Sequence, residues 1–167
     1  VTQNINQLEE IERFHSSIAQ KLSHLAVGKI ILISSSAVYG NHKHIFSEHD
    51  ECKPRSNYGR SKLNIENTYL EKLHDNISIL RLGNVLGLDT LGKALANGNV
   101  RHRYIDCRND YSTPMRTYVD AQILSDIIIS YIRNFGNLPR KLNIGRKHPQ
   151  SMDSAVQELG IDFELRI

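Results

Sequence analysis

The chain has 167 residues, enough for one domain with a hydrophobic core. Its apolar fraction of 40% and charged fraction of 23% are ordinary for a soluble globular protein. A net charge of +3 is too small to indicate a nucleic-acid-binding protein. The most basic segment, residues 101–108, suits a phosphorylated small molecule equally well.

The cysteine pattern and the N-terminus bound the class of protein further. Cys52 and Cys107 form no CxxC pair, which excludes a disulfide framework or a zinc site built from cysteines. The first ten residues are too polar for a signal peptide, and no apolar run is long enough to span a membrane. We therefore expect a cytoplasmic protein with reduced thiols. The chain starts without Met inside a helical pattern, so we also expect a fragment.

Apolar periodicity predicts the elements in the first half of the chain. Apolar residues at steps of three and four predict an amphipathic helix over residues 4–25. Residues 29–34 form a β-branched apolar run that is typical of a strand buried in a parallel sheet. Residues 41–57 are polar and predict a loop. A second helix is predicted over 58–73 and a second buried strand over 77–82.

The second half gives weaker signals. Residues 83–99 are rich in Gly and Asn and receive no assignment. A helix is predicted over 119–132, a short strand over 141–144, and a last helix that Ser151 caps and that runs through Leu159. The order of strands and helices predicts an α/β fold with a doubly wound parallel sheet, and we expect residues 1–167 to form a single domain.

Tyr58 and Lys62 carry the most specific chemistry. They are four residues apart, which places them on one face of a helix about one turn apart. An ammonium beside a phenol favours the phenolate, so that the tyrosine can serve as a general acid or base. Most such pairs are solvated neighbours with no special role, so the pair alone is a weak signal.

Three serines strengthen that signal. Ser34, Ser35 and Ser36 end the first predicted strand, just upstream of the second predicted helix. The carboxyl end of a strand is a common place for a site in an open α/β sheet. A hydroxyl there can bind a substrate oxygen while Tyr58 moves the proton. The alternative is that the serines satisfy backbone groups at the strand end, which we expect for at least one of them.

Five segments together resemble the extended short-chain dehydrogenase/reductase family. They are ILISSSAVYG, SEHDECKPRSNYGRSKLNIE, ILRLGNVLG, RTYVDA and LNIG, in the family's order and at near-family spacing. They are most similar to the NAD-dependent sugar-nucleotide epimerase and dehydratase group, such as UDP-galactose 4-epimerase. The resemblance implies the C-terminal part of that fold, a partial Rossmann-like doubly wound parallel sheet.

The resemblance also implies roles for individual residues. Ser35, Tyr58 and Lys62 match the family's catalytic serine, tyrosine and lysine, with Ser36 as the nearest alternative to Ser35. Tyr58 would exchange the proton and Lys62 would bind the nicotinamide ribose. Ser34, Tyr58 and Lys62 would contact the cofactor, NAD or NADP. Ser36, Asn84 and Arg116 would bind the nucleotide-sugar substrate, the last two at its diphosphate. A guanidinium suits that role because it binds phosphate oxygens in a bidentate fork.

The resemblance also indicates which class of reaction to expect. Family members that remove water place Asp and Glu directly after the catalytic hydroxyl residue, where this chain has Ser36 and Ala37. We therefore expect an epimerase or a ketosugar reductase, with bacterial surface-polysaccharide synthesis as the implied pathway. Family members often dimerise through the two long helices, here about 4–25 and 58–73. A homodimer is therefore expected, with neither nucleic acid nor a membrane as partner.

The chain departs from the family in two places. No GxxGxxG turn is present, and that turn holds the cofactor pyrophosphate at a helix N-terminus. We therefore expect this chain alone to bind NAD(H) weakly or not at all and to be inactive by itself. The substrate-binding segment, about residues 85–118, is short, and Ala121 stands where the family has a second acid. A degenerate member that acts as a non-catalytic binding or interaction module is the alternative.

Two other kinds of site are disfavoured. His42, His44 and His49 lie in the polar loop without the spacing of paired metal ligands, so no metal is expected. A serine hydrolase is equally disfavoured because no GxSxG elbow is present.

Overall fold

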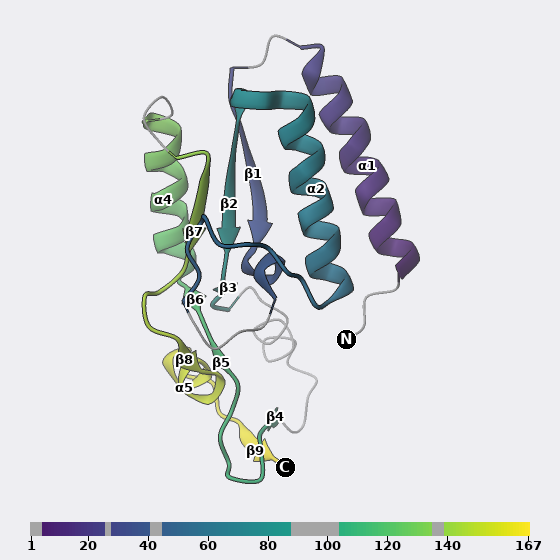
Figure 1. Cartoon of the computed structure of the whole chain (residues 1–167). Coiled ribbons are helices and arrows are strands. Elements are labelled where there is room, and N and C mark those ends of the chain that lie inside the picture. Colours follow the sequence, from purple (N-terminus) through teal and green to yellow (C-terminus); the bar gives the residue numbers. More distant parts are fainter. Residues whose placement is uncertain (1–4, 26–27, 41–44, 88–103, 135–138) are drawn as a thin grey trace. The chain divides into compact units, whose positions relative to one another are not determined.

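The computed structural model describes residues 5–25, 28–40, 45–87, 104–134 and 139–167 (Figure 1). The chain's internal contacts divide it into two compact units. The first unit is Val1–Leu82 with Asn134–Asn143, and the second is Gly83–Arg133 with Ile144–Ile167. The single domain expected from the sequence stays a prediction.

A three-stranded sheet forms the centre of the first unit, in the order β1-β2-β7. Strands β1 (Ile30–Ser35) and β2 (Ile77–Leu82) pair in parallel, and β7 (Lys141–Ile144) lies on the other side of β2. All six residues of β2 are buried, as a continuous apolar run predicts for a strand covered on both faces. The parallel pair confirms the predicted α/β class and the three predicted strands.

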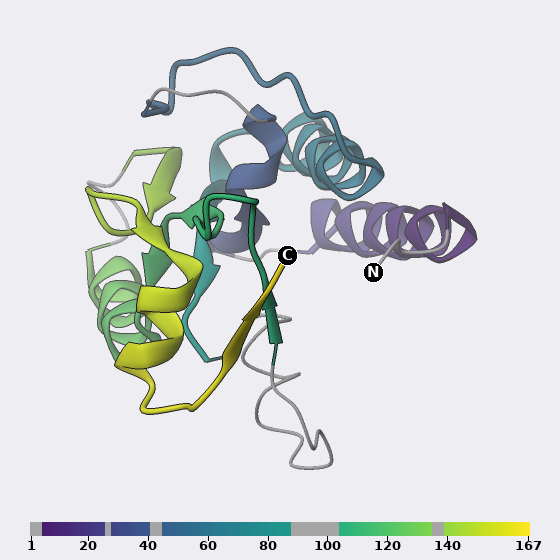
Figure 2. The same cartoon turned by 90° about the horizontal axis from the view of Figure 1, so that it is seen from below.

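Two long helices pack against this sheet. Helices α1 (Ile5–Ser23) and α2 (Asn57–Leu73) lie side by side, as both views show (Figures 1 and 2). Both helices were predicted within two residues of these bounds. Ser56 caps α2 by accepting a hydrogen bond from the amide of Gly59. The helices and strands share a core of seven buried residues, Ala19, Leu32, Ile65, Tyr69, Leu73, Ile77 and Ile79.

The chain turns sharply where β1 ends. A short 3-10 helix, η1 (Ser36–Tyr39), follows at once, and the Ser35 hydroxyl caps it by accepting a hydrogen bond from the Ala37 amide. The N-terminal turn of α2 packs closely on η1, because a Cβ built at Gly59 would lie 2.5 Å from the Ala37 carbonyl oxygen. The serine-rich strand end and the start of α2 are therefore in direct contact.

The second unit is built from short strand pairs. β3 (Asn84–Val85) pairs with β6 (Tyr118–Val119), and β4 (Tyr104–Asp106) pairs with β9 (Glu164–Arg166). Both of these pairs are parallel. A third pair, β5 (Met115–Arg116) with β8 (Gln150–Ser151), is antiparallel. The sequence predicted none of these strands, because segments of two or three residues are too short to show a periodicity.

The remaining helices are α4 (Ala121–Arg133), η2 (His74–Asn76) and α5 (Met152–Glu158). α4 confirms the helix predicted over 119–132, starting two residues later. Ser151 occupies the N-cap position of α5 as predicted, but its side chain makes no capping hydrogen bond there. Among the helices within the described ranges, none combines the length and the apolar character needed to cross a membrane.

The close approach at Gly59 gives a test of the first unit. We expect Gly59→Ala to lower the free energy of unfolding by about 1–3 kcal/mol, because the new methyl group meets backbone atoms of Ala37 that cannot move independently. Urea denaturation measures the change. Gly28→Ala is the matched control, since a Cβ at Gly28 meets nothing within 4 Å. Equal stability of the two variants would contradict this account of the η1–α2 contact.

Candidate active site

The structure brings Tyr58 and Lys62 together on α2, as their spacing predicted. Tyr58 is the second residue of the helix and is 38% exposed. The Lys62 ammonium nitrogen lies 5.9 Å from the centroid of the Tyr58 ring, within the range of a cation–π contact. An accessible phenol thus stands beside a cation, while the catalytic roles of both residues stay predictions.

Lys62 differs from an ordinary surface lysine. Its side chain is partly buried, and this burial lowers its pKa below the ordinary value of a lysine. The negative charge of Glu66, one turn further along α2, opposes the shift by raising the pKa. Lys62 is therefore a partly desolvated cation whose charge is stabilised by the nearby carboxylate of Glu66.

The three serines at the end of β1 have different surroundings. Ser35 is partly buried and its hydroxyl accepts the Ala37 amide at 3.2 Å, which leaves the O–H available as a donor. Ser34 is buried and donates its hydroxyl to Glu66 Oε1 at 2.5 Å. Ser36 is exposed as the first residue of η1. The prediction that at least one serine satisfies a backbone group is confirmed for Ser35, which accepts the Ala37 amide. Ser34 bonds a side-chain carboxylate instead, and its predicted cofactor contact stays a prediction.

A buried ion pair lies beside Ser34. Glu66 and Arg81 are 0% and 2% exposed, and Arg81 Nη2 lies 2.7 Å from Glu66 Oε2. Arg81 Nε adds bonds of 3.1 and 3.2 Å to the two carboxylate oxygens. Burial alone would lower the pKa of Arg81, but the hydrogen bonds to Glu66 and Tyr39 raise it above the ordinary value of an arginine. The pair is therefore a charged, fully bonded group.

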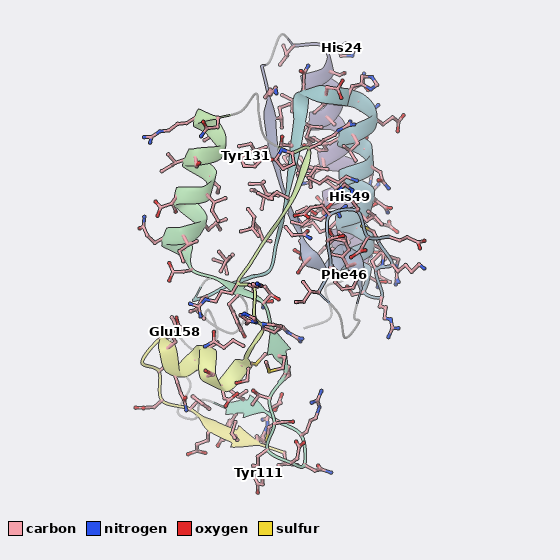
Figure 3. The ribbon with its side chains drawn as sticks, turned by 60° about the vertical axis from the view of Figure 1, so that its left-hand side comes forward. His24, Phe46, His49, Tyr111, Tyr131 and Glu158 are labelled. Atoms are coloured by element: carbon pink, nitrogen blue, oxygen red, sulfur yellow. The ribbon has the colours of Figure 1, made fainter. Side chains whose placement is uncertain are left out.

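The hydrogen bonds continue from this pair to the loop that follows η1. Arg81 Nη1 donates to the Tyr39 hydroxyl at 2.7 Å, and that hydroxyl donates to Asn143 Oδ1 at 2.8 Å. Asn143 in turn donates its side-chain amide to the carbonyl of Phe46 and its backbone amide to Glu48. Phe46, labelled in Figure 3, stacks on the Tyr39 ring with the centroids 4.7 Å apart.

Sequence reasoning missed this cluster, although two signals were present. Arg81 interrupts an otherwise uncharged buried strand, and a charge in such a strand requires a partner. Glu66 follows Lys62 by one helical turn, on the side of α2 that packs on the sheet. The two charges of opposite sign lie in neighbouring elements and could have been paired on these grounds.

The second unit holds Asn84 and Arg116, and it brings their segments together. The backbone amide of Asn84 donates to the carbonyl of Thr117, the residue after Arg116, at 2.8 Å. Asn84 is partly buried, whereas Arg116 is exposed and donates only to its neighbouring carbonyl among the bonds the structure records for its side chain. The Asn84–Thr117 bond therefore holds the segment of Asn84, on β3, beside the segment that contains Arg116, on β5.

Other predictions fall partly outside the described residues. Of the loop histidines, His49 is exposed and His42 and His44 lie outside the described ranges. Within those ranges, no three His, Cys, Asp or Glu side chains gather closely enough to hold a metal ion. Residues 88–103, about half of the predicted substrate-binding segment, also lie outside them.

The desolvation of Lys62 has a measurable consequence for stability. The unfolded chain binds the Lys62 proton more tightly than the folded chain, so this group costs stability at neutral pH. We expect Lys62→Met to be more stable than the parent at pH 7. That advantage should shrink as the pH rises through the lowered pKa toward the ordinary lysine value. Chemical denaturation between pH 7 and 10.5 measures it.

Lys147→Met, at an exposed position, is the matched control and should show no such pH-dependent advantage. A Lys62→Met variant that is less stable than the parent at pH 7 would contradict the account of a desolvated ammonium.

Enzymes of known structure whose fold is similar to that of this chain catalyse different reactions. A UDP-Glc/GlcNAc 4-epimerase from Campylobacter jejuni superposes with a TM-score of 0.75 at 22% identity over 99% of this chain. A dTDP-4-dehydrorhamnose reductase from Clostridium acetobutylicum gives 0.72 at 21% identity over 96%. An NAD-dependent NDP-hexosamine 5,6-dehydratase involved in tunicamycin biosynthesis gives 0.73 at 19% identity over 95%. These likenesses establish a Rossmann-type fold, and the chain spans 55–59% of the length of these three proteins.

No curated protein matches the chain in sequence. The family described as "NAD dependent epimerase/dehydratase family" matches residues 5–145, which include every residue predicted for the site. The chain therefore belongs to the NAD-dependent epimerase/dehydratase family.

Proposed function

We propose that the full-length protein is an NAD(P)-dependent epimerase or ketosugar reductase that acts on a nucleotide-activated sugar. One observation carries the proposal: an exposed Tyr58 phenol lies beside the partly buried Lys62 ammonium, 5.9 Å from its ring centroid, in a chain of this family. The start of α2 that bears Tyr58 packs on η1, directly after Ser35. A proton-transferring group, a cation and a hydroxyl are thus held by contacting elements.

Each of the three residues has a distinct task in the proposed reaction. The Tyr58 hydroxyl takes the proton from the sugar hydroxyl that is oxidised and returns a proton when a carbonyl is reduced. The Lys62 ammonium favours the phenolate form during this exchange. Ser35 donates its hydroxyl hydrogen to the reacting oxygen, because its bond to the Ala37 amide uses it as an acceptor and leaves the O–H available as a donor.

The donor groups on this face of α2 suit a nicotinamide nucleotide. Lys62 supplies N–H donors for the ribose hydroxyls, and the Tyr58 phenol supplies a hydroxyl at an accessible position. When bound, the nicotinamide supplies hydride transfer. The proposal includes both NAD and NADP, and it retains Ser34 as a predicted contact through its remaining lone pairs.

The proposed substrate-binding residues suit a diphosphate. Arg116 is exposed, and the backbone amide of Asn84 bonds the carbonyl of the residue after it, so the two residues lie in neighbouring segments. A guanidinium binds phosphate oxygens as a bidentate donor. Ser36 is exposed at the start of η1 and is proposed to bind the sugar. UDP-sugars are a reasonable first choice of probe, since an epimerase of similar fold acts on UDP-Glc and UDP-GlcNAc.

The choice of reaction rests on side-chain chemistry because the fold hosts several reactions. Elimination of water from a sugar needs an acid and a base beside the reacting carbons. Ser36 and Ala37, the residues after Ser35, provide neither. We therefore propose epimerisation or ketosugar reduction rather than dehydration.

We also propose that the protein forms a homodimer through the long helices. Helix α1 exposes apolar side chains, with Ile11 41% and Phe14 63% exposed. Burying them against a second copy removes apolar surface from water. We expect Phe14→Asp to shift the protein from dimer to monomer in sedimentation equilibrium, because the dimer would bury an unpaired carboxylate. A variant that sediments as the parent does would exclude this helix face as the interface.

Replacing Tyr58, the proposed acid/base, tests whether the protein is an enzyme. We expect Tyr58→Phe to lower kcat by about 10²–10⁴-fold, because the ring remains but the proton-transferring hydroxyl is lost. Turnover of UDP-sugars with NAD in the full-length protein measures the effect. Tyr111→Phe, at an exposed residue of the second unit, is the control and should leave kcat unchanged. Unaltered turnover in Tyr58→Phe would refute the proposed role and favour the non-catalytic module.

A further inference from the structure

We propose that Glu66, clamped by Arg81, is the positioning residue of the Ser35, Tyr58 and Lys62 site. The inference rests on the proposed function for its catalytic part. It adds a residue that touches neither substrate nor cofactor and that acts through the residues beside it. Three independent features of the first unit carry it.

The first feature is that one carboxylate joins the two segments that bear the site. Glu66 Oε1 accepts the Ser34 hydroxyl at 2.5 Å, and Ser34 directly precedes Ser35. On its own helix, Glu66 follows Lys62 by one turn, and Lys62 follows Tyr58 by one turn. The position of the carboxylate therefore determines how the Ser35 hydroxyl lies relative to the proposed acid/base face of α2.

The second feature is the completeness of the clamp. Arg81 uses Nε and Nη2 on the Glu66 carboxylate and Nη1 on the Tyr39 hydroxyl, so all three guanidinium nitrogens are engaged. In the sheet, Arg81 lies opposite Ser34. A bidentate guanidinium fixes the plane as well as the distance of a carboxylate. Apolar residues of similar size would usually pack here with equal stability, so stability alone does not account for the buried charges.

The third feature is the extension to η1 and its loop. The Tyr39 hydroxyl, at the end of η1, joins Arg81 to Asn143, and Asn143 bonds the loop at Phe46 and Glu48. The turn that begins at Ser35 is therefore fixed at both ends, by Glu66 through Ser34 and by Arg81 through Tyr39. The charge of Glu66 also raises the pKa of Lys62 against the effect of its burial.

The double variant Glu66→Met/Arg81→Met tests the inference, because it removes both charges together and leaves no unpaired ion. We expect it to unfold cooperatively, to lose about 10²-fold in kcat and to change KM little, since the reacting groups are misplaced rather than removed. Hydrogen exchange of the Ala37 amide, which is bonded to the Ser35 hydroxyl, should become at least about tenfold faster. Amides of the α1–α2 core should keep their protection.

The matched control removes a second ion pair. Arg146 Nη2 lies 2.6 Å from Glu158 Oε1 in the second unit, and both side chains are about two-fifths exposed (Figure 3 labels Glu158). Arg146→Met/Glu158→Met should leave kcat and Ala37 exchange at the parent values. Glu66→Asp provides a milder variant that keeps both charges but shortens the carboxylate arm. It should also speed Ala37 exchange and lower kcat, by less than the double variant.

The outcomes separate the inference from the proposed function. Unchanged Ala37 exchange and unchanged kcat in folded Glu66 variants would overturn the inference. If the double variant does not fold, Glu66→Asp decides by the same two measurements. If the parent protein turns over no nucleotide sugar, the proposed function fails while the exchange of Ala37 still tests the positioning. Faster exchange then supports it, and parent-like exchange overturns it.

Discussion

The first unit depends on one constraint: a full positive charge lies inside a strand whose six residues are all buried. Such a charge is stable only with a bonded partner of opposite sign, and the helix that covers β2 supplies it as Glu66. The pairing fixes the register of α2 on the sheet. A shift of α2 by one residue would rotate Glu66 away from Arg81 by about 100° and leave both charges buried without partners.

The proposed chemistry follows from that register. With Glu66 fixed, the residues one and two turns earlier, Lys62 and Tyr58, lie where α2 begins and where η1 packs on Gly59. Burial decreases along this face of α2: Glu66 is fully buried, Lys62 partly buried and Tyr58 exposed. The fixed side chain of Glu66 therefore lies behind the two residues that need access to ligands.

The two long helices and the sheet strands of the first unit could be predicted because each is long enough to show its apolar pattern. The helices and the strands β1, β2 and β7 were located within two residues. The strands of the second unit could not, since two or three residues carry no period and their pairing depends on distant segments. The proximity of Tyr58 and Lys62 could also be predicted, because it depends only on their spacing along one helix. The partly buried state of Lys62 and the Asn84–Thr117 contact depend on packing between segments far apart in the chain.

The hydrogen bonds of the buried cluster also differ in how far along the chain they reach. Arg81 and Glu66 are 15 residues apart, Ser34 and Glu66 are 32 apart, and Tyr39 and Asn143 are 104 apart. Closing a longer loop costs more chain entropy and takes more time. Both partners of the ion pair precede Asn143 in the chain and are synthesised before it. The loop at Phe46 and Glu48 therefore lacks its bonds to Asn143 until strand β7 has been synthesised.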